Sequence, residues 1–346
     1  MAKIKTTVIG SYPKYPRIIG ENFDTKWLVS PGENLDKGWK SKENLEELQQ
    51  EAIRWAVKEQ EKAGIDILTD GEQRRGNFVL YHCQHLEGFD FVNKEEKKLR
   101  GGSRTELVPT IKGFVKNKEP FLVKEFEFLK KLTKKEIKIT IPGPLTIIDS
   151  SKDLFYDDEK KLALDVARAI REEVKSLAEA GCKIIQFDEP AFIREPQKFF
   201  NYGIDALEEC FRGVEGITTI VHICRGYPSK EKDVKAEKEN YAQVVEALSK
   251  TNINQIAIED AHEHLNLDFF KKFGSKTVIL GSVEIGGVKV ESVDEIQKRI
   301  KEILTIISPE QLQVSPDCGL LLLSPEIAKA KLTNLVLAAK KVSDSV

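Results

Sequence analysis

Two short segments carry residue types that bind transition metals in proteins. "VHICRGYP" (221–228) places His222 and Cys224 two positions apart at the end of an apolar run, and "VSPDCG" (314–319) places Cys318 at the end of another. Side chains two apart on a strand point to the same face, so His222 and Cys224 can reach one ion. An imidazole and two thiolates are zinc-type ligands, although a His-x-Cys pair by itself is weak evidence for a metal.

Polar residues follow the other apolar runs in the same way: Ser11, Asp70, Glu72, Asp188, Glu189, Glu259, Asp260, Glu284 and Asp317. Burying a carboxylate is costly unless it is paired. Glu72 and Asp188 therefore favour a role in binding a cationic group of a ligand. The alternatives are an ion pair with Arg74 or Arg75, or a helix cap.

Short β-branched runs and long amphipathic stretches alternate along the whole chain. The expected strands lie at 6–10, 65–70, 137–143, 183–189, 217–224, 254–260, 277–282 and 312–319. The expected helices include 43–63, 158–180, 233–250, 293–306 and 325–342, with apolar residues every three or four positions. Eight nearly continuous apolar strands, each followed by a helix, predict parallel pairing in a (β/α)8 TIM barrel, with a doubly wound open sheet as the alternative.

The barrel interpretation treats residues 1–346 as a single catalytic domain of the α/β class. Two long connections, 11–42 after the first strand and 71–136 after the second, exceed usual loop lengths. The second, 71–136, is predicted to be an insertion or lid within the domain. Active sites of this fold lie at the carboxyl ends of the strands, which is where the polar residues fall.

Composition excludes several classes of function. The 54 basic and 56 acidic residues leave a formal net charge of −2. The protein therefore has no strong positive electrostatic field that would recruit nucleic acid or an anionic membrane. No segment reaches signal-peptide or transmembrane length, and we expect a cytoplasmic protein. Five scattered cysteines do not make a disulfide framework and remain available for packing, metal binding or catalysis.

Six motifs together resemble one family. "DGE" (70–72), "IPGPLTI" (141–147), "QFDEPAF" (186–192), "HIC" (222–224), "IAIED" (256–260) and "PDCGL" (316–320) are similar, in order, to the catalytic half of cobalamin-independent methionine synthases. The chain looks like a short, single-barrel form. The resemblance implies homocysteine as methyl acceptor and a zinc ion (Zn2+) bound by His222, Cys224, Glu259 and Cys318.

The same resemblance assigns substrate-binding residues. Glu72 and Asp188 would hold the homocysteine ammonium, and Ile9, Gly10 and Ser11 its carboxylate. Coordination to zinc deprotonates a thiol, which supplies the thiolate nucleophile at neutral pH. Glu259, the oxygen ligand among softer ones, is the candidate to be displaced by the substrate sulfur and is the expected catalytic residue. The predicted reaction is displacement of a methyl group by that sulfur, giving methionine.

The methyl donor is predicted from two departures from the family. Gly286 stands where a pterin-protonating histidine is expected, and Ser150 stands near the place of a pterin-stacking tryptophan. Both favour a methylated corrinoid, such as methylcobalamin on a corrinoid protein, over methyltetrahydrofolate. Methyltetrahydrofolate remains the alternative, with Glu284 or His262 as the acid.

Two further interpretations stay open. A related zinc barrel could alkylate another thiol such as coenzyme M, although the Glu72 and Asp188 carboxylates would repel a sulfonate without an ammonium. A zinc and thiol-binding barrel without turnover is the non-enzymatic alternative. The remaining cysteines and histidines are expected to pack or to lie in solvated loops: His82, Cys83, His85, Cys182, Cys210, His262 and His264.

Overall fold

The computed structural model describes residues 3–19, 43–99, 104–226 and 239–345 of the chain. Seven parallel strands form its main sheet, in the order β1 (Lys5–Thr6), β12 (Leu312–Pro316), β11 (Thr277–Val283), β10 (Gln255–Ile258), β9 (Thr218–Ile223), β8 (Ile184–Asp188) and β6 (Ile139–Pro142). Each strand lies inside or within one residue of an apolar run that the sequence predicted.

Two shorter strands link the edges of this sheet. β2 (Ile67–Leu68) pairs in parallel with β5 (Glu136–Ile137), which directly precedes β6 in the chain. A parallel bridge between Thr7 and Ile67 joins β2 to the segment after β1. The pairings therefore run around a ring of eight strand positions, and the predicted (β/α)8 barrel is confirmed.

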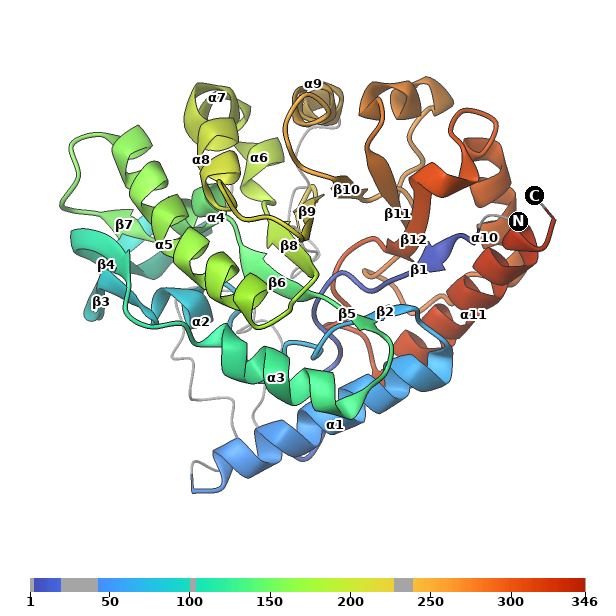
Figure 1. The fold of residues 1–346 in the computed structure, drawn as a ribbon, viewed down its shortest axis with the longest axis horizontal. Helices are drawn as coiled ribbons and strands as arrows, with labels where there is room; N and C mark the ends of the chain where they lie inside the picture. The colour runs from blue at the N-terminus through green and yellow to red at the C-terminus, as the bar shows by residue number, and fades with distance from the viewer. Residues whose placement is uncertain (1–2, 20–42, 100–103, 227–238, 346) are drawn as a thin grey trace.

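Helices cover the outside of the strands (Figure 1). The long ones are α1 (Leu45–Ala63), α3 (Leu122–Leu132), α5 (Glu159–Glu179), α9 (Glu239–Leu248), α10 (Val293–Ile303) and α11 (Pro325–Ser343). Shorter turns of helix are α2 (Leu80–Cys83), α4 (Pro144–Asp149), α6 (Ala191–Arg194), α7 (Pro196–Lys198), α8 (Ile204–Glu209), η3 (Phe199–Gly203), η4 (Leu267–Phe273) and η5 (Pro309–Gln311). None of the described helices is long and apolar enough to span a membrane.

Two helices end as the sequence predicts. Gly64 and Gly181 follow α1 and α5 with φ near 94°, the left-handed conformation that stops a helix and that glycine adopts without strain. At the other end of α5, the Asp158 side chain accepts hydrogen bonds from the backbone of Lys160 and Lys161. Local sequence signals therefore set the bounds of these helices.

The core has two parts. Most buried apolar residues lie between the strands and the covering helices. A second, separate cluster is made of one inward residue from each of six strand positions: Ile9, Ile67, Ile184, Ile220, Ala257 and Ile279. Side chains of this kind fill the centre of a parallel barrel, so the interior is packed and the open end above it is left for chemistry.

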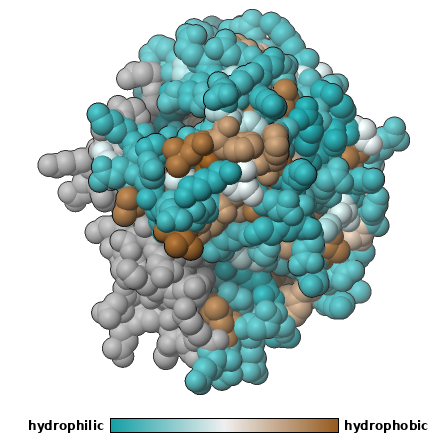
Figure 2. All heavy atoms as spheres, turned by 90° about the vertical axis from the view of Figure 1, so that its left-hand side faces the viewer, coloured by the Kyte–Doolittle hydropathy of each residue, from teal (hydrophilic) through white to brown (hydrophobic). Residues whose placement is uncertain are grey.

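The connection 71–136 contains a long hairpin that the sequence did not predict. β3 (Leu86–Leu99) and β4 (Arg104–Asn117) pair antiparallel with two register irregularities, and β7 (Lys152–Asp153) adds to β4. Figure 2 faces this side of the molecule and shows hydrophobic residues gathered on its surface. Phe114 in β4 and Phe155, two residues after β7, are exposed. Whether the insertion acts as a lid stays a prediction, and 20–42 of the first connection lies outside the described residues.

A buried ion pair fixes the loop after β10 to helix α10. The Arg299 guanidinium donates to both carboxylate oxygens of Asp260, at 2.7 and 2.8 Å, and to the carbonyl of Leu265 at 2.6 Å. Asp260 is fully buried. Asp260, one of the polar residues that follow the predicted strands, therefore has a structural role as the partner of Arg299.

Replacing Arg299 with methionine is expected to lower the free energy of unfolding by about 3–5 kcal/mol, because it strands a buried carboxylate. Urea unfolding of the variant measures this change. Lys298→Met on the exposed face of the same helix is the control, with an expected change within about 0.5 kcal/mol. A loss below about 1 kcal/mol for Arg299→Met would contradict the assignment.

Candidate active site

Three potential metal ligands meet at the carboxyl ends of β9 and β12. His222 is in β9, Cys224 directly follows it, and Cys318 lies two residues after β12. One donor atom from each lies within 4.8 Å of the others, and all three residues are buried. The His222 Nε2 atom is 3.5 Å from the Cys318 sulfur. Parallel pairing brings these residues together across 96 positions of sequence.

The donor set fits a zinc ion. Two sulfurs and one imidazole nitrogen are soft and borderline ligands of the kind that zinc takes in a tetrahedral site. The second ring nitrogen of His222, Nδ1, is buried and has no hydrogen-bond partner among the described residues. Such a group is unusual in a folded protein and is consistent with a functional position.

The three groups strongly influence one another's protonation. A hydrogen bond from Cys318 holds the pKa of the Cys224 thiol well below its usual range, although burial opposes this shift. Burial lowers the pKa of His222, but the hydrogen bond with Cys224 and nearby negative charges leave it raised overall. These shifts favour a Cys224 thiolate beside a protonated His222, and a metal ion bound by both groups would release the imidazole proton.

Glu259, the predicted fourth ligand, lies next to this group but not within it. Glu259 directly follows β10 and is buried. Its negative charge acts to raise the pKa values of His222 and Cys318. One carboxylate oxygen accepts a bond of 3.4 Å from the backbone of Arg225. Among the described residues, the cluster of mutually close donor atoms contains His222, Cys224 and Cys318 but not Glu259. Coordination by Glu259 stays a prediction.

A cavity of about 130 Å³ opens beside the three metal-binding candidates. All five predicted substrate-binding residues line it: Ile9, Gly10, Ser11, Glu72 and Asp188. They come from β8 and from the segments that follow β1 and β2. The fold therefore brings every predicted site residue except Glu259 to the wall of one cavity.

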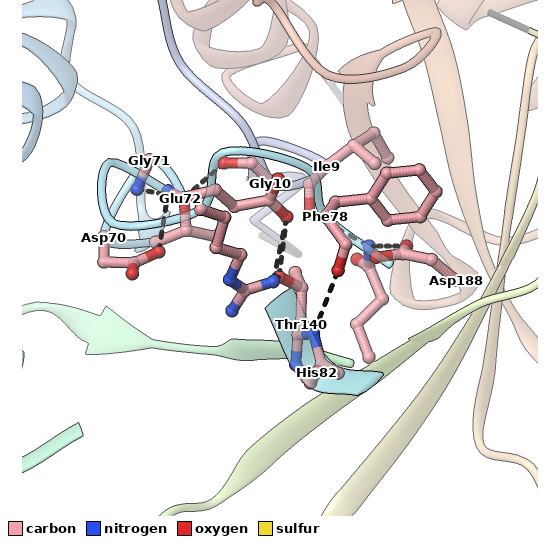
Figure 3. A network of polar contacts seen from close by, with 12 residues as sticks. Ile9, Gly10, Asp70, Gly71, Glu72, Phe78, His82, Thr140 and Asp188 are labelled. Carbon is pink, nitrogen blue, oxygen red and sulfur yellow. Dashed lines mark hydrogen bonds and ion pairs between the residues drawn. The ribbon is translucent and has the colours of Figure 1, made fainter. Parts of the chain in front are cut away.

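Glu72 is bound by protein groups on the cavity wall. Its Oε1 atom accepts a hydrogen bond of 2.8 Å from the Thr140 hydroxyl (Figure 3) and one of 3.3 Å from the Arg75 guanidinium. The ion pair with Arg75 that the sequence offered as an alternative is thus present, whereas Arg74 pairs with Glu46. Both roles are compatible because a carboxylate has two oxygens and several acceptor sites.

The turn that presents Glu72 is strained. Glu72 has φ of 55° although it is not glycine, and the preceding Gly71 has φ of 67°. The Asp70 carboxylate holds the turn by accepting 2.8 Å from the Glu72 backbone N–H. A side-chain-bearing residue in the left-handed region costs free energy, and such residues concentrate at functional sites.

Asp188 is held differently. Its Oδ1 atom accepts 2.7 Å from the Gln186 side chain, and it is the register partner of His222 on the neighbouring strand β9. Burial, together with the charge of Glu72, raises the pKa of Asp188 to about 7, although His222 acts to lower it. A cationic ligand group placed between Asp188 and Glu72 would relieve this repulsion.

Close packing leaves no room for a side chain at Gly10. A Cβ atom there would lie 2.5 Å from the Glu72 carboxylate. Gly10→Ala is therefore expected to displace Glu72 and to raise the KM for the predicted substrate, homocysteine, about tenfold or more. Steady-state kinetics test this, with Gly113→Ala as control, because its Cβ would meet nothing closer than 3.7 Å. Equal kinetics for the two variants would refute the prediction.

Two polar strand-end residues serve the scaffold. Asp317 accepts hydrogen bonds from three successive backbone N–H groups, those of Asp260, Ala261 and His262, at 2.8–3.0 Å. It therefore ties the loop that carries Glu259 to the loop that carries Cys318. Glu189 in the same way accepts from the first residues of α4, Leu145 and Thr146.

The other histidines and cysteines agree with the packing interpretation. His82 and Cys83 are buried in and around α2, and His85 stacks on Phe121 with ring centroids 3.9 Å apart. Cys182 and Cys210 are fully buried. His262 is half-exposed and lies 3.1 Å from Glu284. His264 has a partner among neighbouring groups.

Comparison with known proteins gives consistent matches over the whole chain. The family described as "Cobalamin-independent synthase, Catalytic domain" matches residues 4–341. Methionine synthase of Saccharolobus solfataricus is 33% identical over 346 residues, which cover 99% of this chain and 96% of that protein. Methionine synthase of Pyrococcus furiosus is 32% identical and covers 98% of this chain and 93% of that protein.

Solved structures agree with the sequence matches. A B12-independent methionine synthase from Shewanella sp. W3-18-1, in complex with selenomethionine, superimposes with a TM-score of 0.87. The two chains are 32% identical, and the match covers 99% of each. A putative vitamin-B12-independent methionine synthase from Listeria monocytogenes, 22% identical with a TM-score of 0.74, shares the fold.

Proposed function

Because the chain belongs to the cobalamin-independent methionine synthase family, catalytic domain, and is a methyltransferase of that type, we propose that it methylates homocysteine at a zinc ion held by His222, Cys224 and Cys318. Glu259 is the proposed fourth ligand. The observation that carries the proposal is that these three donor atoms cluster at the cavity lined by the substrate-binding candidates.

The homocysteine amino acid group is assigned to the other residues that line the same cavity. Asp188 and Glu72 receive the ammonium, and the backbone of Ile9, Gly10 and Ser11 receives the carboxylate. The Shewanella relative was solved with selenomethionine, a close analogue of the product methionine, which supports an amino acid as the ligand of this site. Barrel residues thus fix the orientation of the substrate before reaction.

Zinc bound at this site would lower the pKa of the substrate thiol so that it reacts as a thiolate. The protein residues contribute position and exclusion of water. His222, Cys224 and Cys318 are almost fully buried, so a sulfur bound beside them would be shielded from water. Asp149, Ser150 and Arg194 also line the cavity and are partly exposed, and we assign the methyl donor to their side of it.

The donor that we propose is a methyltetrahydrofolate. The family is described as cobalamin-independent and the Shewanella relative as B12-independent. These descriptions count against the corrinoid donor that the sequence favoured. A folate leaving group needs a proton, and the pair of His262 with Glu284 could supply it after the approach of the donor.

A methylated corrinoid is the second candidate. It is favoured by Gly286, which carries no acid, and by Ser150, which lines the donor side of the cavity without an aromatic ring. The two candidates differ in one testable respect, because departure of cobalt(I) requires no proton and departure of the folate nitrogen does.

Methionine formation by zinc-loaded protein decides among the candidates. Homocysteine is supplied with methyltetrahydrofolate or with methylcobalamin, in parallel reactions. Turnover with the folate that falls at least about tenfold in His262→Ala supports the proposed donor and acid. Turnover with methylcobalamin alone supports the corrinoid. No turnover with either, together with no binding of homocysteine, would refute the assigned acceptor.

A further inference from the structure

A lysine lies buried beneath the substrate side of the cavity. Lys138 directly precedes β6, and none of its surface is exposed. Its backbone N–H donates 2.9 Å to the Leu68 carbonyl, which fixes its place between β2 and β6. A fully buried lysine is rare unless a partner compensates its charge. No reaction step described above uses it.

The partner of Lys138 is a side chain that also contacts the active site. The Lys138 ammonium donates 2.6 Å to the Oε1 atom of Gln186. The amide nitrogen of the same Gln186 donates 2.7 Å to Asp188 and 2.9 Å to the Ile9 carbonyl. Three buried groups thus form a chain that runs from Lys138 to the cavity wall.

The donors and acceptors of this hydrogen-bonded series follow from the chemistry of its three side chains. An ammonium only donates and a carboxylate only accepts, so the amide between them must turn its oxygen to Lys138 and its nitrogen to Asp188. Oδ1 of Asp188 is thereby occupied, while the residue still lines the cavity. Gln186 also donates to the backbone carbonyl of Ile9, which gives the amide a second fixed anchor.

Charge supports the same assignment. Glu72 has its own buried cation, Arg75, at 3.3 Å. On the Asp188 side the corresponding cation is Lys138, reached through Gln186. Burial lowers the pKa of Lys138 to about 7, while the charges of Asp188 and Glu72 act to raise it. Each carboxylate of the proposed ammonium site is thus supported by a cation from within the barrel.

We propose that Lys138 is a positioning residue for homocysteine: it orients Gln186, which is also anchored on the Ile9 carbonyl, and Gln186 holds the Asp188 carboxylate in place for the substrate ammonium. This inference rests on the proposed function, since it assigns Asp188 to the ammonium. Lys138 does not touch the substrate or the metal ligands. Its effect is on substrate affinity and not on the chemical step.

The test compares two ligands that differ by one group. Zinc-loaded wild type and Lys138→Met are titrated calorimetrically with homocysteine and with 4-mercaptobutanoate, which has the thiol and the carboxylate but no amino group. Lys138→Met is expected to weaken homocysteine binding about tenfold, the effect of losing support for one charge-assisted hydrogen bond, and to change 4-mercaptobutanoate binding less than threefold.

A matched control separates this effect from the general loss of a buried lysine. Lys331 in α11 is also fully buried and pairs with Glu291 at 2.8 Å, but it does not line the cavity. Lys331→Met is expected to lower thermal stability and to leave both ligand affinities unchanged. If Lys138→Met does not fold, Lys138→Gln, which keeps a donor, is compared with wild type by the same pair of titrations.

Gln186→Leu removes the middle member of the hydrogen-bonded series Lys138, Gln186 and Asp188. If the residues act in series, Gln186→Leu and the double variant with Lys138→Met lose similar homocysteine affinity, so the effects are not additive. The inference is overturned if Lys138→Met and Lys331→Met bind homocysteine with equal affinity. It is also overturned if Lys138→Met loses affinity for homocysteine and for 4-mercaptobutanoate to the same degree. Failure of the wild type to bind homocysteine overturns the proposed function instead.

Discussion

Replacing Cys318 with alanine is expected to lower zinc affinity at least about a hundredfold and to abolish methionine formation. Even groups that only support a metal ligand change affinity by about 10–100-fold, and Cys318 is proposed to bind directly. Its sulfur lies 3.5 Å from His222 Nε2, so its removal opens one side of the site. Zinc content after dialysis against a chelator measures the first effect, and the methyl transfer assay measures the second.

The matched control for this experiment is Cys182→Ala. Cys182 is also a buried cysteine, and its sulfur donates a hydrogen bond to the backbone carbonyl of Ile184. The same chemical change is therefore expected to leave zinc content at the wild-type level and to alter stability alone. Full zinc retention and activity in Cys318→Ala would remove the metal assignment, and with it the proposed activation of the thiol.

Replacing Asp188 with asparagine is the change with the second largest expected effect. It keeps the shape of the side chain but removes the charge that would receive the substrate ammonium. A hydrogen bond to a charged group contributes about 1.5–3 kcal/mol, so the KM for homocysteine is expected to rise about tenfold to a hundredfold. Because the ammonium is bound equally before and during the reaction, kcat should change much less.

The ligand without an amino group again provides a control. Binding of 4-mercaptobutanoate to Asp188→Asn should match or exceed wild type, because a carboxylate that repels the ligand's own charge has been removed. Asp165→Asn in α5, where Asp165 pairs with Arg168 and does not line the cavity, should leave binding of both ligands unaffected. Loss of kcat with unchanged KM in Asp188→Asn would assign this residue to the reaction step instead of substrate binding.

The amino-acid sequence by itself determined the ring of strands and the position of the site. Apolar runs of five to eight residues can be buried on both faces only in a parallel sheet covered by helices, and that requirement led to the barrel. The polar residues that follow each run then had to meet at one end of it. His222, Cys224 and Cys318 were found in this way, and Glu72 and Asp188 were found with the help of the family resemblance.

Sequence patterns did not reveal the hairpin of β3 and β4. Each strand is 14 residues long, and their pairing contains shifts of register that interrupt any regular alternation. Much of this small sheet is exposed, so the burial that produces a clear period of two is absent. The hairpin is therefore specified by contacts between its strands more than by the pattern within either of them.

The tertiary structure decided which charged groups compensate one another. Nothing in the sequence around Lys138 indicates that its ammonium lies beneath Asp188, because their link passes through Gln186, 48 positions away. Likewise, only the fold places Asp317 under the backbone of 260–262 and keeps Glu259 beside the three mutually close ligands. Periodicity reports which residues are buried, whereas pairing between buried polar groups depends on strand register and packing, which bring distant segments within hydrogen-bond distance.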